Sequence, residues 1–309
     1  MLGIDAGGSK TVCLLADERG HVLAEARGSG ANLQVSGELE VEKVLHGVMT
    51  EALGDPDIRP DAICLGIAGV DRPNDAAAVR SIMRRIGSTR RVLVVNDALI
   101  ALVAGAGDDP GVVIVAGTGS IAYGRDASGR AARAGGWGYL LGDEGGGFWI
   151  GRAALSAVVR QFDGRGPSTL LTEMVLEEMR LTSPTEVIHA VYDHGLPRRS
   201  IASIASVVQR ACDAGDAIAS EILDRAAAEL TSAASSVITR LDMRGEEFWI
   251  ILSGGIFAGI PALVPNVSAR LPEVAPRSRV RALDVEPALG AVRLALATAQ
   301  GAVAVPVYV

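Results

Sequence analysis

Apolar and polar positions follow two kinds of pattern along this chain. Short apolar runs bounded by glycine, asparagine or aspartate predict buried strands. Longer segments carry apolar residues three and four positions apart, which predicts amphipathic helices. In the segment 38–53 the apolar positions are Val41, Val44, Leu45, Val48, Met49 and Ala52. The alternation of the two patterns predicts a mixed α/β protein.

The predicted elements fall into two successive groups. The first group has strands at 1–4, 12–16, 21–26, 61–70 and 91–95, and helices at 38–53, 75–86 and from 96 to about 103. The segment 105–111 is rich in glycine, aspartate and proline and is the expected crossing between the groups. The second group has strands at 112–116, 121–123, 248–252 and 279–285, and helices within 148–244, at 261–271 and at 287–298. A periodic, alanine-rich stretch at 217–241 predicts one long helix in that region.

A glycine turn at 5–11 joins the first two predicted strands. The backbones of Gly7 and Gly8 can adopt angles closed to other residues and let an anion approach closely. Their N–H groups predict an anion nest, to which the next residues can add hydroxyl and ammonium donors: Ser9, Lys10 and Thr11. Asp5 suits a phosphate that carries magnesium. A plain hairpin is the alternative, because Gly-Gly forms one readily.

The same design occurs a second time. An apolar run at 112–116 leads into Gly117-Thr118-Gly119-Ser120, and a short apolar run follows at 121–123. A type II′ hairpin without a ligand would also explain this turn. The repetition favours phosphate binding at both turns.

Composition narrows the class of protein. The 309 residues are sufficient for two domains, and 49% of them are hydrophobic while 4% are aromatic. A net charge of −7 provides no general attraction to nucleic acid or to anionic membranes. Cys13, Cys64 and Cys212 form no CxxC pair, which favours a reduced, cytoplasmic protein over a disulfide scaffold. We find no signal peptide and no membrane-spanning stretch in the pattern, and therefore expect a soluble protein.

Four segments, in order, resemble the sugar kinase/actin/heat-shock-chaperone ATPase superfamily. They are 5–11, Val94-Val95-Asn96-Asp97, 117–120 and Leu252-Ser253-Gly254-Gly255. Within this superfamily the segment 135–146, Gly-Gly-Trp-Gly-Tyr-Leu-Leu-Gly-Asp-Glu-Gly-Gly, looks like the N-acetylglucosamine kinase branch, the BadF/BadG/BcrA/BcrD ATPase family. The resemblance spans nearly the whole chain.

The resemblance implies two ribonuclease H-like (actin-like ATPase) domains with a nucleotide and sugar cleft between them. The first domain is expected to comprise 1–108 plus 287–309, and the second 109–286 with a helical insertion.

The resemblance also implies roles for individual residues. Asp97 is expected to orient the attacking sugar hydroxyl and to accept its proton, although an aspartate at this position is often only a helix N-cap. Expected nucleotide contacts are Gly7, Gly8, Ser9, Lys10, Thr11, Gly117, Thr118, Gly119, Gly254 and Gly255. Expected sugar contacts are Asn32, Asp97, Gly119, Ser120, Trp137 and Asp143, and Asp5 is expected on the metal side.

Several of these residues have a second interpretation. Lys10 is as readily a solvated side chain, and Asn32 an ordinary left-handed turn residue. Trp137 could fill space in the loop rather than contact the sugar, and Gly254-Gly255 could be a common helix-opening turn. Ile121 stands where acetylhexosamine kinases of this family commonly carry asparagine, so the sequence leaves the identity of the sugar open.

The function implied is ATP- and Mg²⁺-dependent phosphorylation of an amino sugar, N-acetylglucosamine or glucosamine, at its 6-hydroxyl. We expect a cytoplasmic homodimer that binds neither nucleic acid nor membrane. One alternative is an ATPase that activates a CoA-linked dehydratase or reductase, which would resemble iron–sulfur dimers. The other alternative is a non-catalytic regulator that binds sugar or nucleotide.

Overall fold

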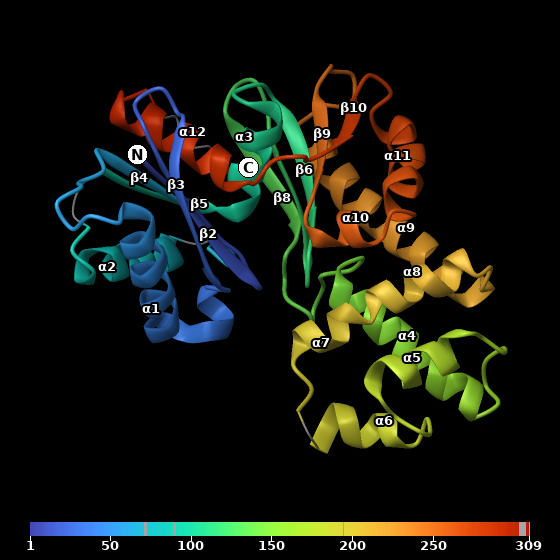
Figure 1. The fold of residues 1–309 in the computed structure, drawn as a ribbon. Helices are drawn as coiled ribbons and strands as arrows, with labels where there is room; N and C mark the ends of the chain where they lie inside the picture. The colour runs from blue at the N-terminus through green and yellow to red at the C-terminus, as the bar shows by residue number, and fades with distance from the viewer. Residues whose placement is uncertain (71–72, 89–90, 194, 303–306, 309) are drawn as a thin grey trace.

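The computed structural model describes residues 1–70, 73–88, 91–193, 195–302 and 307–308. It contains two β-sheets with helices packed against them (Figure 1), which confirms the predicted α/β class.

The first sheet has five strands in the order β3-β2-β1-β4-β5. Their bounds are β1 Leu2–Ala6, β2 Lys10–Ala16, β3 Val22–Ser29, β4 Ala62–Ile67 and β5 Arg91–Asn96. The first three strands are antiparallel neighbours, whereas β1, β4 and β5 run parallel. The carboxyl ends of β1 and β5 therefore lie at one edge of the sheet.

Helices cover both faces of this sheet. Successive side chains of β2 pack alternately against the helices on one face and on the other. Cys13 and Leu15 belong to the core beneath α1 (Leu33–Leu53) and α2 (Pro73–Arg85). Val12 and Leu14 point the other way and pack on α12 (Ala288–Ala299). Because successive side chains of a strand point to opposite faces, one strand contributes to two cores.

The second sheet has six strands in the order β10-β9-β6-β7-β8-β11. Their bounds are β6 Gly111–Ala116, β7 Ser120–Arg125, β8 Arg130–Gly135, β9 Trp249–Ser253, β10 Arg279–Ala282 and β11 Val307–Tyr308. An antiparallel meander (β6, β7, β8) is again extended by parallel strands on the β6 side. Apart from β11, the topology repeats that of the first sheet.

The second group of elements carries most of the helices. Their bounds are α4 Gly147–Phe162, α5 Leu171–Met179, α6 Glu186–Ile188, a π-helix His189–Asp193, α7 Arg198–Ser203, α8 Ala205–Asp213, α9 Ala217–Arg240, α10 Gly255–Gly259 and α11 Leu263–Val274. The predicted long helix at 217–241 is confirmed as α9. The helical stretch expected within 148–244 is divided among several helices and their connections.

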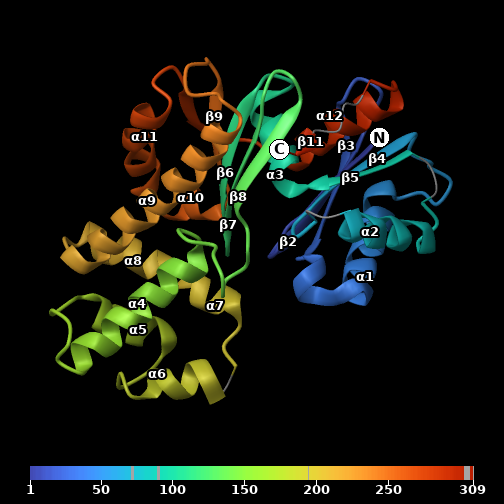
Figure 2. The same ribbon diagram turned by 180° about the vertical axis from the view of Figure 1, so that it is seen from behind.

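Helix α3 (Asp97–Ala106) lies between the two sheets, as both views show (Figures 1 and 2). One core cluster joins its side chains to β4 and β5 of the first sheet, to β6 and β9 of the second, and to α12. The helices approach so closely that a Cβ at Gly290 of α12 would lie 1.9 Å from the Ile100 carbonyl oxygen. Arg293 of α12 donates to the Val103 carbonyl at 2.9 Å, and the same carbonyl accepts from the C-cap residue Gly107, so α12 is also hydrogen-bonded to the last turn of α3.

Some predicted bounds differ from the structure. The element α1 consists of two helical pieces divided at Gly37, which has a φ of +75°, so the helix expected at 38–53 is confirmed as the second piece and the piece before Gly37 was not predicted. The strand expected at 61–70 is shorter, because glycine and turn residues follow Ile67. The end of the chain also differs: α12 packs on the first sheet as expected, but β11 pairs with β8 of the second sheet. The predicted domain boundaries remain a prediction.

Across the described residues, no helix combines the length and the apolar character that crossing a membrane requires.

Asp216 provides a stability test of the helical part. Its carboxylate caps α9 by accepting from Ala219 N at 2.8 Å, and it also accepts from Leu170 N at 2.6 Å and Thr169 Oγ1 at 3.0 Å. Burial alone would raise the pKa of Asp216, but these hydrogen bonds together lower it. A carboxyl whose pKa is lowered on folding contributes stability above its unfolded pKa, and this is lost as the pH falls through the folded pKa.

Asp216→Asn should therefore lower the free energy of unfolding at pH 7 by about 1–3 kcal/mol. The deficit should narrow as the pH falls below about 4, where the parent carboxyl is protonated in the unfolded chain. Urea unfolding at pH 7 and at low pH measures both values. Asp224→Asn is the control, because its exposed ion pair with Arg270 should contribute little. An equal deficit at both pH values would contradict the role of the ionised carboxylate.

Candidate functional site

The two predicted glycine turns meet in the structure. One joins β1 to β2 and the other joins β6 to β7, so they come from different sheets. The Ser9 Oγ and Thr118 Oγ1 atoms lie 3.0 Å apart, within hydrogen-bonding distance. Two loops that are 109 positions apart in sequence therefore form one surface.

Packing beneath the first turn holds it in place. Gly7 N donates to the Lys10 carbonyl at 3.0 Å, and Ala31 N donates to the Gly7 carbonyl at 3.0 Å. A Cβ on Gly30 would lie 2.3 Å from the Gly8 carbonyl oxygen, so a glycine is needed there. Neither Gly7 nor Gly8 has a positive φ, so the turn does not use the left-handed angles that glycine can adopt.

Thr11 does not face the surface of this turn. It is fully buried, and its hydroxyl donates to the Ser29 carbonyl at 2.7 Å. The prediction that the Thr11 hydroxyl donates to a phosphate is therefore corrected, because this hydroxyl already donates to a carbonyl within the sheet.

The second turn is bonded to the start of α4. Gly147 N donates to the Gly117 carbonyl at 2.8 Å, and Phe148 N donates to the Thr118 carbonyl at 2.9 Å. The loop glycines Gly117 and Gly119 have no positive φ, so the turn is not of type II′. Its shape depends instead on the segment that leads into α4.

Asp143 lies directly against this second turn. Its backbone is left-handed, with a φ of +60°, and its Oδ1 accepts from Gly138 N at 3.2 Å. A Cβ on Gly119 would lie 2.3 Å from Asp143 Oδ2. Burial raises the pKa of Asp143, while hydrogen bonds from the Gly138 and Ser120 backbones oppose the shift. The hydroxyl of Ser120 donates to the Glu144 carbonyl at 2.6 Å and so also holds this segment.

Asp5 and Asp97 stand at the same edge of the first sheet. Asp5 is the fourth residue of β1, and Asp97 follows β5 directly, with β4 between the two strands. The pKa of Asp5 is raised to about 7, first by burial and then by the charge of Asp97. Two carboxylates therefore influence each other at the point where the parallel strands end.

The N-cap interpretation of Asp97 is wrong. Asn96 is the capping residue of α3, and its Oδ1 accepts from Ala98 N at 2.8 Å. Asp97 is the first residue inside the helix and is partly exposed. Its carboxylate therefore has another use than closing the helix end.

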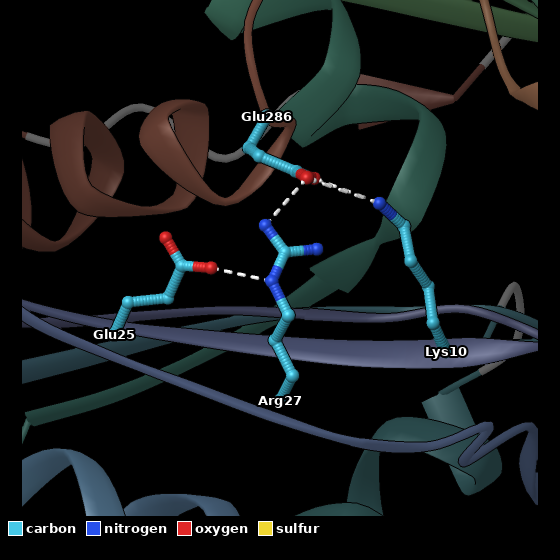
Figure 3. Close-up of polar contacts among 4 residues, drawn as sticks. All are labelled: Lys10, Glu25, Arg27 and Glu286. Carbon is cyan, nitrogen blue, oxygen red and sulfur yellow. Dashed lines mark hydrogen bonds and ion pairs between the residues drawn. The ribbon is translucent and has the colours of Figure 1, made fainter.

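Lys10 is engaged in an ion cluster that the sequence did not indicate (Figure 3). Its ammonium lies 2.9 Å from Glu286 Oε2 and 3.2 Å from Oε1. Arg27 donates to Glu286 Oε1 at 2.9 Å and also pairs with Glu25. The interpretation of Lys10 as a merely solvated side chain is therefore wrong in this structure, while its contact with phosphate stays a prediction.

The loop that carries Trp137 is exposed. Trp137 is 58% exposed, and Leu140 and Leu141 are each exposed by more than three-quarters. The Arg133 guanidinium lies over the Trp137 ring, 4.9 Å from its centroid. Trp137 therefore does not plug the core, and apolar side chains in this loop remain available for contact.

The remaining predicted site residues have varied surroundings. Gly254 has a φ of +108°, and a Cβ there would lie 2.3 Å from the Ala116 carbonyl oxygen, so this glycine is required by the fold. Gly255 begins α10 and faces open space.

Asn32 precedes α1 without a left-handed backbone, so the turn-residue interpretation is wrong. Ile121 lies on β7, where a Cβ on Gly136 would meet its side chain at 2.9 Å.

A separate hollow of about 640 Å³ lies between α4 and α9, lined in part by Trp149, Arg152 and Arg225. None of the predicted site residues lines it. The loops above, rather than this hollow, bring the predicted chemistry together.

Comparison with known proteins finds similarity along nearly the whole chain. The BadF/BadG/BcrA/BcrD ATPase family matches residues 2–295. An N-acetylmuramic acid/N-acetylglucosamine kinase of Clostridium acetobutylicum is 36% identical over 298 residues, which cover 96% of this chain and 97% of that protein. An N-acetyl-D-glucosamine kinase of Dictyostelium discoideum is 34% identical over 309 residues, with coverages of 96% and 97%.

Solved structures share the fold. A candidate N-acetylglucosamine kinase from Chromobacterium violaceum has a TM-score of 0.75 at 27% identity, covering 96% of this chain and 98% of that chain. A ROK family glucokinase from Streptomyces griseus has a TM-score of 0.59 at 16% identity, covering 96% of this chain and 97% of that chain. At that identity the likeness extends to the fold alone.

Gly117→Ala tests whether the second turn approaches phosphate. An added Cβ at Gly117 meets no atom within 4 Å, so the protein itself should tolerate it. Nucleotide affinity should fall by about tenfold or more, because the added methyl group would fill the space beside the turn and hold the phosphate away from the Thr118 hydroxyl. One hydrogen bond to a charged group is worth about 1.5–3 kcal/mol. Calorimetric titration with ADP measures this, and Gly245→Ala, which also faces open space, is the control. Unchanged affinity would contradict the phosphate role. Gly119 is a poorer probe because its Cβ would displace Asp143.

Asp5→Asn tests the electrostatic cost of the buried carboxyl. Because the pKa of Asp5 is raised to about 7, the folded chain retains a proton between about pH 4 and 7 that the unfolded chain has lost. The contribution of Asp5 to stability therefore falls as the pH rises through this window and stays low above it. Asp5→Asn should melt a few °C higher than the parent at pH 8, with a smaller difference at pH 5. A variant that melts lower at pH 8 would show that the charge of Asp5 stabilises the fold.

Proposed function

This chain belongs to the BadF/BadG/BcrA/BcrD ATPase family, and from that premise we propose that it transfers the γ-phosphoryl group of ATP to a hydroxyl of an amino sugar. One observation carries the proposal. Two glycine turns from different sheets meet through Ser9 and Thr118, and the carboxylates of Asp5 and Asp97 stand at the sheet edge from which the first turn extends. Two relatives more than 30% identical over nearly the whole chain are sugar kinases.

Three glycines have the free space that a bound phosphate needs. A Cβ on Gly8, Gly117 or Gly255 would meet no other atom within 4 Å. These residues belong to the three loops expected to hold the nucleotide, and each leaves open space beside its Cα. The N–H of Gly117 itself donates to the Gly119 carbonyl at 2.9 Å, so the Thr118 hydroxyl is a donor that this turn can offer. The hydroxyls of Ser9 and Thr118 lie where they can exchange their mutual contact for phosphate oxygens.

Asp97 is the proposed general base. It is partly exposed at the amino end of α3, and capping is performed by Asn96, so its carboxylate can accept a proton from the attacking hydroxyl. The charge of Asp97 is one cause of the raised pKa of Asp5, which places the two side chains within electrostatic range.

Asp5 is the proposed residue on the magnesium side. Its pKa is raised because burial and the charge of Asp97 outweigh the opposing charge of Lys10, so a further cation would stabilise the ionised carboxylate. Magnesium is commonly held by one or two carboxylates together with substrate phosphates. When bound, the ion would offset negative charge on the phosphates. No group of three or more histidine, cysteine or acidic side chains suited to a metal occurs among the described residues.

The sugar is proposed to lie beside the second turn. Asp143 and the exposed Trp137 belong to the segment packed on that turn, and an aromatic face suits an acetamido methyl or a sugar ring. Asn32 is proposed to contact the sugar from the first sheet. The names of the relatives favour N-acetylglucosamine or N-acetylmuramic acid, and we propose the 6-hydroxyl as the acceptor.

The activator alternative receives no support from the cysteines. Cys13 and Cys64 are fully buried, and burial raises the pKa of Cys13 to about 12 and that of Cys64 further. A thiol that resists ionisation is a poor ligand for an iron–sulfur cluster. Cys212 lies in α8 on the other half of the molecule. Only a measurement of sugar-dependent activity distinguishes a non-catalytic regulator from a kinase.

Sugar-dependent ADP release tests the proposal. A coupled assay over N-acetylglucosamine, N-acetylmuramic acid, glucosamine, N-acetylmannosamine and glucose should show activity with an N-acetylated sugar and little ATP hydrolysis without sugar. Absence of sugar-dependent release across this panel would contradict the kinase and favour a regulator.

Asp97→Asn should lower kcat by about 10²–10⁴ while nucleotide affinity stays close to that of the parent, because the amide keeps the shape but cannot accept the proton. Stopped-time assays for kcat and calorimetric titration with ADP measure the two quantities. A kcat within a few-fold of the parent would remove Asp97 as the base, and Asp143 would be the next candidate.

A further inference from the structure

Glu286 occupies an unusual position in the chain. It belongs to the segment that leaves β10 in the second sheet and enters α12, which packs on the first sheet. Its side chain reaches the strands of the first sheet at Lys10 and Arg27 (Figure 3). One carboxylate therefore joins a crossing segment to the strand that follows the first phosphate turn.

Strand register explains why these charges converge. Val12 is the cross-strand partner of Arg27, and Lys10 lies two positions before Val12, so all three point to one face of the sheet. Val12 packs on α12, which identifies that face. Lys10 and Arg27 stand near the end of this covered face, and Glu286 enters from just before the first turn of α12.

The ion cluster contributes little to the stability of the fold. The side chains of Lys10 and Arg27 are more than half exposed, and that of Glu286 is 30% exposed. Exposed pairs of this kind contribute about 0–1 kcal/mol. Partial burial would raise the pKa of Glu286, but the hydrogen bonds from Lys10 and Arg27 outweigh it and lower the pKa, so the carboxylate is charged at neutral pH.

The cluster also reaches the proposed active site. The positive charge of Lys10 lowers the pKa of Asp5, and the negative charge of Glu286 raises it. Lys10 is the residue that directly follows Gly7-Gly8-Ser9, where the phosphates are proposed to lie. The ammonium is therefore held by a carboxylate at the edge of the site where a polyanion is expected.

We propose that Glu286 is an internal substitute for phosphate: it holds Lys10 in the ligand-free protein and competes with the nucleotide for that ammonium, which sets nucleotide affinity. This inference rests on the proposed function. Binding of the polyphosphate replaces the Lys10–Glu286 pair with a Lys10–phosphate pair, while Arg27 stays with Glu286 and Glu25. Part of the attraction between Lys10 and phosphate is offset by the loss of this pair, so nucleotide binds more weakly and ADP leaves more easily.

Replacing the carboxylate of Glu286 by a neutral amide tests the inference. Glu286→Gln should bind ADP about three- to tenfold more tightly than the parent in calorimetric titration, with an unchanged melting temperature because the pair is exposed. Glu25→Gln is the matched control: it removes the same charge from the same cluster, but Glu25 pairs with Arg27 and not with Lys10. Its affinity for ADP should stay within twofold of the parent.

A double-mutant cycle shows whether Glu286 acts through Lys10. Lys10→Met should weaken ADP binding by about tenfold, and adding Glu286→Gln to it should change the affinity by less than twofold, because the competition has been removed. Weaker binding by Glu286→Gln alone would overturn the inference and make the glutamate a support for Lys10. An equal gain in both backgrounds would also overturn it, since the effect would then be a general one of charge.

The same titrations separate this inference from the proposed function. If the parent binds ADP but releases none from ATP in response to any sugar, the kinase proposal fails and the cycle still decides the role of Glu286. If sugar-dependent release is present and Glu286→Gln behaves as Glu25→Gln does, the kinase stands and the inference fails.

Discussion

The packing of α3 between the two sheets is the contact on which the rest of the structure depends. Its side chains join β4 and β5 to β6 and β9, and α12 presses on it closely enough that Gly290 has no room for a Cβ. Arg293 of α12 adds a hydrogen bond to the Val103 carbonyl in the last turn of α3. A helix held on several sides cannot shift easily, so Asp97 at its amino end is fixed beside the end of β1. The position of the proposed base follows from a core contact rather than from a loop.

Glycines in the site fall into two kinds, and the difference separates structure from binding. Gly30, Gly119 and Gly254 are required by neighbours in the protein, since an added Cβ would lie 2.3 Å from a backbone or carboxylate atom. Gly8, Gly117 and Gly255 have open space beside them. The first kind lets the loops pack against one another, whereas the second leaves open space that a ligand can enter. Both kinds are needed, because a surface that receives phosphate must itself be held rigidly.

Charge in the site is balanced locally rather than over the whole chain. The protein carries a net charge of −7, and acidic side chains at Asp5 and Asp97 add negative charge where an anionic nucleotide is proposed to bind. Lys10 supplies positive charge next to the first turn, and the carboxylate of Glu286 offsets part of that charge. Such an arrangement suits an enzyme that must release its product as well as bind its substrate, since an uncompensated cation beside a phosphate slows departure.

The sequence by itself determined the α/β class, the order of most elements, both glycine turns and the long helix α9, because these depend on local periodicity and turn chemistry. Asp97 was selected because the segment Val94-Val95-Asn96-Asp97 resembles that of a kinase family, and its role as the base stays a prediction. Tertiary structure alone decided that Asn96 and not Asp97 caps α3, that the Thr11 hydroxyl is used inside the sheet, and which glycines are open. It also decided that Lys10 meets Glu286, 276 positions away. No local pattern could indicate that pair, because an ion pair between distant residues depends on the packing of α12 across β2, and that packing exists only after the whole chain has folded.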